Sequence, residues 1–260
     1  MNQVNVQQLS NELASARESG RGIAPLTEKY PNLSIHEAYQ VQLETVSKEL
    51  GLGKIITGKK IGLTSKAMQQ LLGVPEPDYG HLFDDMVVEN GGSISIDNVL
   101  QPKVEAEIAF ILKKDLAGPN VTVLDVLRAT EYVLPALEIV DSRIANWKIK
   151  LPDTIADNAS SGLYVLGGRP TRVDQIDLTQ IGMVLSKNGE LVNTGVGAAV
   201  MGHPANCVAW LANKLSSFDI RLKAGEVILS GALSAAVDAN RGDSFTARFA
   251  HIGQVSVHFN

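Results

Sequence analysis

The stretch Val104-Glu105-Ala106-Glu107-Ile108-Ala109-Phe110 predicts a β-strand with two different faces. Successive side chains of a strand point to opposite sides, so the residues from Val104 to Phe110 at every second position share an apolar face, and Glu105 and Glu107 share the other. Further strand-like runs follow at residues 132–140, 162–168, 181–193, 226–233 and 244–259. Asn188-Gly189 is typical of a tight hairpin turn. Two helices, at about residues 123–132 and 204–217, interrupt a part of the chain that is otherwise strand-rich from about residue 95 onward.

The first third of the chain has a helical pattern instead. Amphipathic segments lie at about residues 4–17 and 35–50, and Ser34 and Glu37 have the spacing of a capping box. A β-branched run after Gly53 indicates one strand, and the prolines near residue 75 then break regular structure. We therefore predict an α+β fold, with a smaller, largely helical N-terminal region at residues 1–75 and a strand-rich domain at residues 76–260.

The composition is that of an ordinary globular protein. The 260 residues are 45% hydrophobic and 20% charged with a net charge of −5, so the chain offers no basic field for nucleic acid or anionic lipid. A single cysteine cannot form an internal disulfide, and the polar N-terminus lacks the apolar core of a signal peptide. No apolar run approaches the ~20 residues of a membrane-spanning helix. We expect a cytoplasmic protein with no nucleic-acid or membrane partner.

Three glutamates raise an electrostatic question. Glu105 and Glu107 repel each other and raise each other's pKa, although a solvent-facing strand is the simpler explanation for this pair alone. Glu138 stands in the apolar run VLPALEIV, where a buried carboxylate is costly without a positive partner. Two explanations stay open. One is an ion pair with Arg143 or Lys148, and the other is a site of three carboxylates, a hard oxygen ligand set that suits Mg²⁺ or Mn²⁺.

Several longer motifs connect the chain to a known family. They are KKIGLTSKAMQQLLGVPEPDYG (59–80), QPKVEAEIAFILKKDL (101–116), VLPALEIVDSRI (133–144), DTIADNASSG (153–162), GAAVMGHPANCVAWLANKL (197–215) and AGEVILSGAL (224–233). In this order and spacing they resemble the 2-hydroxypenta-2,4-dienoate (2-oxopent-4-enoate) hydratases of aromatic meta-cleavage pathways, from about residue 25 to the end. The resemblance extends less closely to the 4-oxalocrotonate decarboxylases and more distantly to the fumarylacetoacetate hydrolase superfamily. It implies a fumarylacetoacetate hydrolase-like mixed β-sheet or barrel for the catalytic, metal-binding domain.

The resemblance also implies roles for individual residues. It places the metal ligands at Glu105, Glu107 and Glu138, and it points to Lys60 of KIGLT and Asp78 of PDYG as catalytic residues that face the metal. We assign Asp78 as the general base and Lys60 as the cationic acid that positions or protonates the substrate. From the residues alone, Asp78 would be a turn residue and Lys60 a surface charge.

Five further residues complete the prediction. The resemblance puts Ser160 near the substrate, with a local turn as an equally good alternative, and Asp141 joins it as a substrate-binding residue close to the third glutamate. Lys59 points the other way from its neighbour on the strand and is predicted to be solvated. His203 is predicted to cap or pack the helix that follows it, and Cys207 to lie in the core.

The reaction that the resemblance implies is hydration of 2-hydroxypenta-2,4-dienoate to 4-hydroxy-2-oxopentanoate. Mg²⁺ or Mn²⁺ would stabilise the dienolate that precedes ketonisation. The alternative is a 4-oxalocrotonate (2-oxo-3-hexenedioate) decarboxylase, for which the resemblance implies an apolar residue in place of Asp78. An acylpyruvate-type C–C hydrolase usually needs a His-carboxylate dyad to activate water, and the sequence offers no suitable His for that role. A non-catalytic complex subunit would not need all three glutamates. The family also implies homo-oligomers and a complex between the sister hydratase and decarboxylase.

Overall fold

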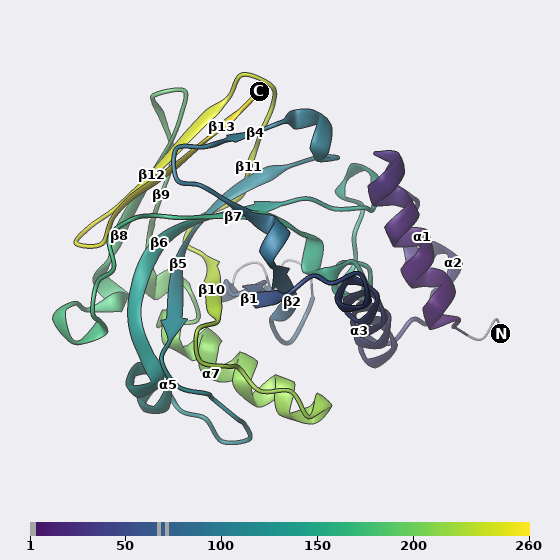
Figure 1. Ribbon diagram of the computed structural model, residues 1–260, viewed down its shortest axis with the longest axis horizontal. Helices are drawn as coiled ribbons and strands as arrows, with labels where there is room; N and C mark the ends of the chain where they lie inside the picture. The colour runs from purple at the N-terminus through teal and green to yellow at the C-terminus, as the bar shows by residue number, and fades with distance from the viewer. Residues whose placement is uncertain (1–3, 67–68, 71–72) are drawn as a thin grey trace.

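The computed structural model describes residues 4–66, 69–70 and 73–260. Among these residues the strands form two sheets with helices around them (Figure 1). The helices are α1 (Val6–Ser19), α2 (Leu26–Lys29), α3 (Ile35–Gly51), α5 (Val123–Ala129), α6 (Leu151–Ala156) and α7 (Pro204–Leu215). The larger sheet contains β1 (Ile56–Gly62), β2 (Asp78–Phe83), β3 (Val87–Val88), β5 (Lys103–Leu112), β6 (Thr130–Val140), β7 (Ser161–Leu166), β10 (Val227–Ala232) and β11 (Val237–Asp238). The smaller sheet contains β4 (Ser93–Ile94), β8 (Gly182–Lys187), β9 (Glu190–Val196), β12 (Ser244–Phe249) and β13 (Gly253–Phe259).

Local sequence signals explain where the N-terminal helices begin. The Ser34 hydroxyl accepts a hydrogen bond from the backbone N–H of Glu37, and the Glu37 carboxylate accepts one from the backbone N–H of Ser34, so α3 starts with the predicted capping box. The side chain of Asn5 caps α1 by accepting from the backbone N–H of Gln8. Both α1 and α6 pack against α3, at the side of the molecule where α1 is drawn in purple (Figure 1). The two long helices predicted for the first third of the chain are confirmed.

The larger sheet is mixed and draws strands from most of the chain. Its strand order is β2-β1-β10-β5-β6-β7-β3, and β11 pairs with β5. β1 pairs in parallel with β10 and antiparallel with β2, although β1 precedes residue 75 and both neighbours follow it. The sheet therefore spans the predicted division into residues 1–75 and 76–260, and that division stays a prediction. The α+β fold itself is confirmed.

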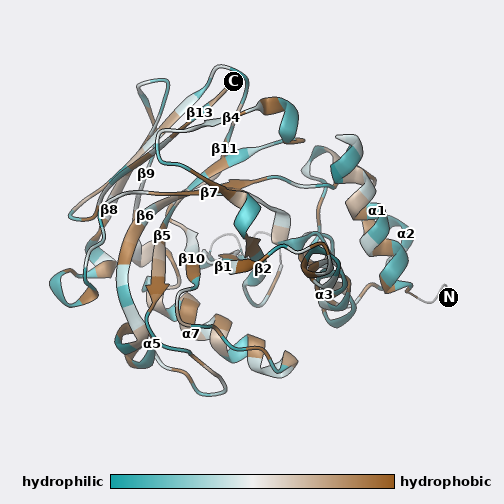
Figure 2. Ribbon diagram, in the orientation of Figure 1, coloured by the Kyte–Doolittle hydropathy of each residue, from teal (hydrophilic) through white to brown (hydrophobic). Residues whose placement is uncertain are grey.

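Strand β5 shows how alternation places the core on one side of the sheet. The alternating apolar residues from Val104 to Phe110 are fully buried in the same hydrophobic core as Cys207 of α7. Figure 2 shows hydrophobic residues concentrated on central strands such as β5 and β10, and hydrophilic residues on the outer turns of α1. The opposite side of β5 carries Glu105 and Glu107, as predicted, and this side faces the candidate site.

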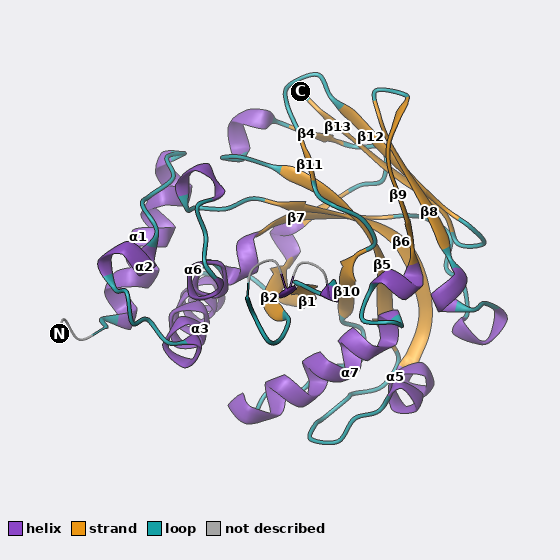
Figure 3. Cartoon of the chain, turned by 180° about the vertical axis from the view of Figure 1, so that it is seen from behind, coloured by secondary structure: helices purple, strands orange, loops and turns teal. Residues whose placement is uncertain are grey.

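The smaller sheet lies against β6 and β7, away from α1 and α3 (Figure 3). Asn188 and Gly189 join β8 to β9 with backbone φ angles of 54° and 85°, the left-handed values that a two-residue hairpin turn of this kind requires. The predicted hairpin is confirmed. Within the described residues, every helix is too short or too polar to cross a bilayer.

Candidate active site

The three glutamates meet because of the pairing register between β5 and β6. Glu105 lies directly opposite Glu138 in this antiparallel pair, and Glu107 lies two residues further along the same face of β5. Each residue offers a carboxylate oxygen, and these three oxygens all lie within 4.8 Å of one another. Glu107 and Glu138 are buried, whereas Glu105 is partly exposed to a cavity. The structure thus brings together the three predicted metal ligands.

The cluster holds more negative charge than its surroundings neutralise. Burial, together with repulsion from Glu138, raises the pKa of Glu105 to about 7, and the same two causes raise the pKa of Glu107 well above its usual range. Glu107 Oε2 accepts a hydrogen bond of 2.7 Å from the backbone N–H of Gly231. Its other oxygen and both oxygens of Glu138 are buried and accept no well-directed hydrogen bond from the described residues. Oxygens of this kind fit a hard divalent cation, because such an ion would supply the missing positive charge and the missing ligand contacts.

Lys60 is the cation that the structure does place in the cluster. It lies on β1, and its Nζ lies 3.2 Å from Glu138 Oε1. Burial alone would lower the pKa of Lys60, but the surrounding carboxylates raise it, so the ammonium form is favoured. The alternative pairing of Glu138 with Arg143 or Lys148 is wrong. The guanidinium of Arg143 pairs with Asp157 instead, and Lys148 is exposed.

Asp78 lies opposite Gly62, where β2 begins, and faces the same side of β1 as Lys60. The Asp78 carboxyl is buried, which excludes the exposed turn that the sequence alone favoured. A Cβ atom on Gly62 would lie 2.2 Å from Asp78 Oδ1 and 3.4 Å from Lys60 Nζ, so glycine is needed here for the close approach. Burial raises the pKa of Asp78, and the charge of Lys60 opposes this effect.

A cavity of about 680 Å³ gives access to these groups. Lys60, Asp78 and Glu105 line its inner part together with Ser160 and Thr154. The remaining lining is mostly apolar and comprises Ile35, Leu63, Val74, Pro75, Val140, Trp147, Ile149, Leu151, Pro152, Ala159 and Ala236, with Gly62, Gly73, Lys103 and Lys150. A pocket of this volume can bury a small organic acid with one charged end and one apolar end.

Ser160 reaches the cavity on a strained turn. Asn158, Ala159 and Ser160 have φ angles of 52°, 51° and 53°, a left-handed conformation that costs roughly 1–2 kcal/mol for each residue with a Cβ atom. Strain of this kind persists where surrounding contacts impose it, and it is concentrated at functional sites. The Ser160 hydroxyl lies 3.2 Å from the Thr154 hydroxyl, so its predicted place beside the cavity agrees with the geometry.

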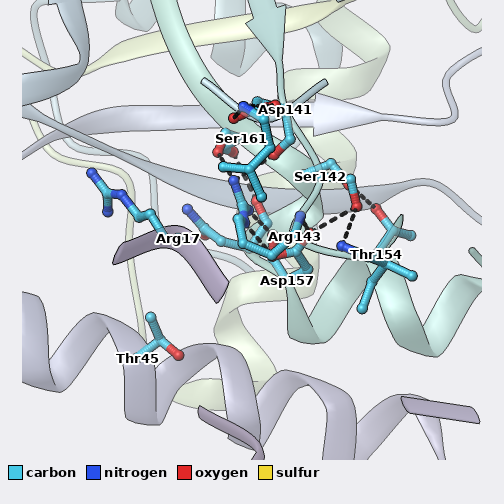
Figure 4. A network of polar contacts seen from close by, with 12 residues as sticks. Arg17, Thr45, Asp141, Ser142, Arg143, Thr154, Asp157 and Ser161 are labelled. Carbon is cyan, nitrogen blue, oxygen red and sulfur yellow. Dashed lines mark hydrogen bonds and ion pairs between the residues drawn. The ribbon is translucent and has the colours of Figure 1, made fainter. Parts of the chain in front are cut away.

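A buried polar network holds this turn in place (Figure 4). Arg143 binds the Asp157 carboxylate and donates to the backbone carbonyl of Ser161 at 2.8 Å. The Asn158 amide exchanges hydrogen bonds of 2.8 and 2.9 Å with the backbone of His81 on β2. The turn that carries Ser160 is therefore connected to the strand that carries Asp78.

Asp141, the second predicted substrate-binding residue, lies elsewhere. Its carboxylate accepts hydrogen bonds from the backbone N–H groups of Leu100, at 3.0 Å, and Gln101, at 2.7 Å. It lies outside the set of described residues that line the cavity. The Asp141 carboxylate thus holds a loop, and its contact with the substrate stays a prediction.

Three neighbouring predictions have clear outcomes. The prediction that Lys59 is solvated is wrong, because Lys59 is 2% exposed and its Nζ lies 2.8 and 3.0 Å from the two carboxylate oxygens of Glu226. His203 caps α7 by accepting from the backbone N–H of Ala205, as predicted. Cys207 is fully buried in the core, as predicted.

Trp147 is a cavity residue that sequence reasoning missed. Its φ angle is 53°, which is a rare conformation for a bulky residue, and Asn146 before it has a φ of 59°. The preceding asparagine was the only signal available in the sequence, because asparagine tolerates this conformation better than most residues.

Comparisons with known proteins cover the whole chain. A family model described as fumarylacetoacetate (FAA) hydrolase C-terminal matches residues 61–260. A 2-hydroxyhexa-2,4-dienoate hydratase from Comamonas testosteroni is 49% identical, over 95% of this chain and 94% of its own. A 2-keto-4-pentenoate hydratase from Paraburkholderia xenovorans (strain LB400) is 47% identical, over 97% and 94%. The structure of 4-oxalocrotonate decarboxylase from Pseudomonas putida G7 complexed with magnesium and adipate superposes over all of both chains, with a TM-score of 0.96 and 38% identity. The mixed-sheet fold predicted for the catalytic domain is confirmed by these matches.

Proposed function

Because the chain belongs to the fumarylacetoacetate hydrolase family, we propose that it is a metal-dependent hydro-lyase that adds water to 2-hydroxypenta-2,4-dienoate to give 4-hydroxy-2-oxopentanoate. This reaction belongs to the catabolism of aromatic compounds by meta-cleavage. The observation that carries the proposal is the position of Lys60 and Asp78 on the wall of a cavity that reaches three clustered carboxyl groups. The hydratase names of the relatives support the same reaction.

We propose Glu105, Glu107 and Glu138 as the ligands of a divalent cation, Mg²⁺ or Mn²⁺. The unsatisfied carboxylate oxygens of Glu107 and Glu138 support this assignment, because they have the chemistry that these ions prefer. Such an ion, when bound, supplies Lewis-acid chemistry by withdrawing electron density from the substrate oxygens.

Asp78 transfers protons in this proposal, and Lys60 positions the substrate. Asp78, with its raised pKa, accepts the proton that leaves the 2-hydroxyl group, and protonation at C5 then leaves a double bond between C3 and C4 in conjugation with the new C2 ketone. The oxygen of water then bonds to C4 while the water loses one proton, and C3 gains one proton, so that one molecule of water enters in total. Lys60 stays charged and orients the anionic substrate through its ammonium group. Ser160 offers a hydroxyl for a further hydrogen bond to the substrate.

The proposal is tested by supplying the purified protein with 2-hydroxypenta-2,4-dienoate. We expect the ultraviolet absorbance of the dienoate to disappear and 4-hydroxy-2-oxopentanoate to form, with activity lost on chelation and restored by Mg²⁺ or Mn²⁺. Asp78→Asn should lower kcat by about 10²–10⁴-fold, the usual contribution of a general base, while leaving metal affinity within a few-fold. An unchanged dienoate in the presence of metal would refute the hydratase assignment.

Decarboxylation is the alternative reaction, and the close superposition with 4-oxalocrotonate decarboxylase supports it. The two reactions are separated by measuring CO₂ release from 2-oxohex-3-enedioate beside consumption of the dienoate. Rapid CO₂ release with the dienoate untouched would establish the decarboxylase instead. The buried acidic Asp78 favours hydration, because a general base is needed to handle protons during the addition of water.

Assembly and location are further proposals. The family resemblance supports a homo-oligomer and a complex with the sister decarboxylase, which light scattering of the protein alone and with that partner would test. A cytoplasmic location follows from the composition and stays a prediction.

A further inference from the structure

The outer part of the cavity continues directly from the carboxyl cluster along β5 and β6. Glu105 pairs with Glu138, and the next residue pair on the same face toward the cavity mouth is Lys103 with Val140. Two residues along a strand span roughly 6.8 Å, which is more than the extended length of a five-carbon chain. A five-carbon acid that is anchored at the glutamates and extends along this face points toward Val140, and a group attached beyond C5 then meets the outer wall.

That outer wall is apolar and is built around Trp147. Val140, Trp147, Ile149, Leu151 and Pro152 all line the cavity there. A cavity of about 680 Å³ exceeds the need of a five-carbon acid, so the apolar wall leaves space for a longer substrate. Burial of apolar groups against such a wall favours binding in proportion to the area removed from water.

Two contacts hold the indole of Trp147 in position. Its indole N–H donates a hydrogen bond of 3.0 Å to the backbone carbonyl of Gln101. The ammonium group of Lys103 lies 5.4 Å from the centre of its ring, within range of a cation–π interaction. The left-handed backbone at Asn146 and Trp147 is costly, and strain of this kind persists where surrounding contacts impose it. A strained residue held this firmly at a cavity wall is suited to selecting among ligands.

We propose that Trp147, with Val140 and Ile149, forms a subsite for an uncharged alkyl group attached at C5 of the substrate. This inference rests on the proposed function, because it concerns the same cavity and the same class of 2-hydroxy-dienoic acid. Trp147 acts as a specificity-determining residue and takes no part in the proton transfers.

Two lysines, Lys103 and Lys150, line the cavity with the apolar residues, and the charge of the one that contacts Trp147 is already balanced. Lys103, whose ammonium group lies over the ring of Trp147, already has Asp238 as its partner, with 2.6 Å between Nζ and Oδ1. A substrate carboxylate that pairs with Lys103 would have to displace Asp238 and would enter a wall made largely of aliphatic and aromatic groups. An alkyl tail leaves this ion pair and the cation–π contact in place.

The first test measures binding without turnover. Trp147 and Trp210 are the tryptophans of the sequence, so in a Trp210→Phe variant the intrinsic tryptophan fluorescence reports on Trp147 alone. The Mg²⁺-loaded variant is titrated with 2-oxopentanoate, 2-oxoheptanoate and 2-oxoheptanedioate, which cannot be hydrated. We expect 2-oxoheptanoate to shift the emission and to bind more tightly than 2-oxopentanoate by about fourfold for each added methylene. Tightest binding by the dicarboxylate, or equal binding by the two monocarboxylates, would overturn the subsite.

The second test measures specificity during turnover. Trp147→Ala keeps the Cβ atom, and with it the backbone strain, but removes the indole. We expect this variant to lower kcat/KM for 2-hydroxyhexa-2,4-dienoate about fivefold or more relative to 2-hydroxypenta-2,4-dienoate. Ile149→Ala should act in the same direction more weakly, and Trp210→Phe is the matched control with unchanged preference. Equal loss for both dienoates in Trp147→Ala would overturn the subsite while leaving hydration intact. Failure of the wild-type protein to hydrate any dienoate, with the order of binding preserved, would instead overturn the proposed reaction.

Discussion

Two adjacent lysines on β1 show the difference between a structural ion pair and a candidate reaction centre. Lys59 and Lys60 point to opposite sides of the sheet, both are almost fully buried, and each faces a glutamate. Glu226 receives two contacts from Lys59 and a third, of 3.1 Å, from the backbone N–H of Lys223. Glu138 has Lys60 at 3.2 Å and shares that single ammonium group with other carboxyl groups.

The charge balance on the two sides explains what each can do. The charges of Lys59 and Glu226 sum to zero, so this ion pair needs no further counter-ion. On the other side, one ammonium group among the four carboxyl groups of Asp78, Glu105, Glu107 and Glu138 leaves a formal charge of −3 when all are ionised. Burial lowers the pKa of Lys59, whereas the carboxylates raise that of Lys60 against the effect of burial. The neutral Lys59–Glu226 pair therefore has a structural role. The excess negative charge around Lys60 would be neutralised by a bound cation.

Neutralising one glutamate on each side should give the largest contrast. Glu138→Gln removes a proposed ligand, so we expect loss of Mn²⁺ binding in calorimetry and a fall in kcat on the order of 10³-fold or more. Glu226→Gln should leave Mn²⁺ affinity and kcat within a few-fold, because Glu226 lies on the other side of the sheet. Equal Mn²⁺ affinity in the two variants would contradict the metal assignment.

The matched lysine variants should differ in kind. Lys60→Met should lower kcat by about 10²–10⁴-fold yet bind the divalent cation more tightly, because it removes a competing positive charge from the cluster. Lys59→Met leaves the buried Glu226 without its partner and should cost about 3–5 kcal/mol of unfolding free energy, with kcat of the folded protein unchanged.

Denaturation with urea and metal titration of the same samples check both lysine predictions. In the double variant Lys59→Met, Glu226→Leu, removal of the second charge should recover most of the lost stability, since apolar replacements of buried pairs are often neutral. A Lys60→Met protein with weaker metal binding would show that the surplus charge has been assigned incorrectly.

His81 provides a pH-dependent test of the Lys59 side. It pairs with Lys59 across β1 and β2, and burial, aided by the nearby lysine charge, lowers its pKa to about 3. The unfolded chain binds a proton near pH 6.5 and the folded chain does not, so stability is present above pH 6.5 and is lost as the pH falls. We expect about 2 kcal/mol of this loss between pH 7 and pH 5. Urea denaturation of wild type and His81→Phe should show it, with a pH dependence in the variant that is shallower by this amount.

The smallest expected effect concerns Ser160. Removal of one neutral hydrogen bond in Ser160→Ala should lower kcat/KM by roughly two- to tenfold without changing metal affinity. Thr57→Val is the control, because the Thr57 hydroxyl contacts Tyr164 at 3.1 Å and is outside the described lining of the cavity. A similar loss in both variants would indicate a general disturbance of packing.

Features that depend on neighbours in the chain were predictable from the sequence. The capping box at Ser34 and Glu37, the hairpin at Asn188-Gly189 and the helix cap at His203 each need only a few consecutive residues. Features that depend on distant contacts were not predictable. The burial of Lys59 requires Glu226, which follows it by 167 residues, and the strained turn at residues 158–160 requires contacts with other elements.

The sequence by itself determined that Glu105 and Glu107 share one face of a strand, because strand side chains alternate with a period of two. Its motifs also determined the family. The family resemblance implied which groups join these two carboxylates, but only the tertiary structure shows how they meet. Glu138 meets them through the register of β5 and β6, and Lys60 reaches Glu138 although β10 and β5 lie between their strands in the sheet order. Register and the curvature of a sheet are properties of paired strands, and for that reason one strand read alone does not contain them.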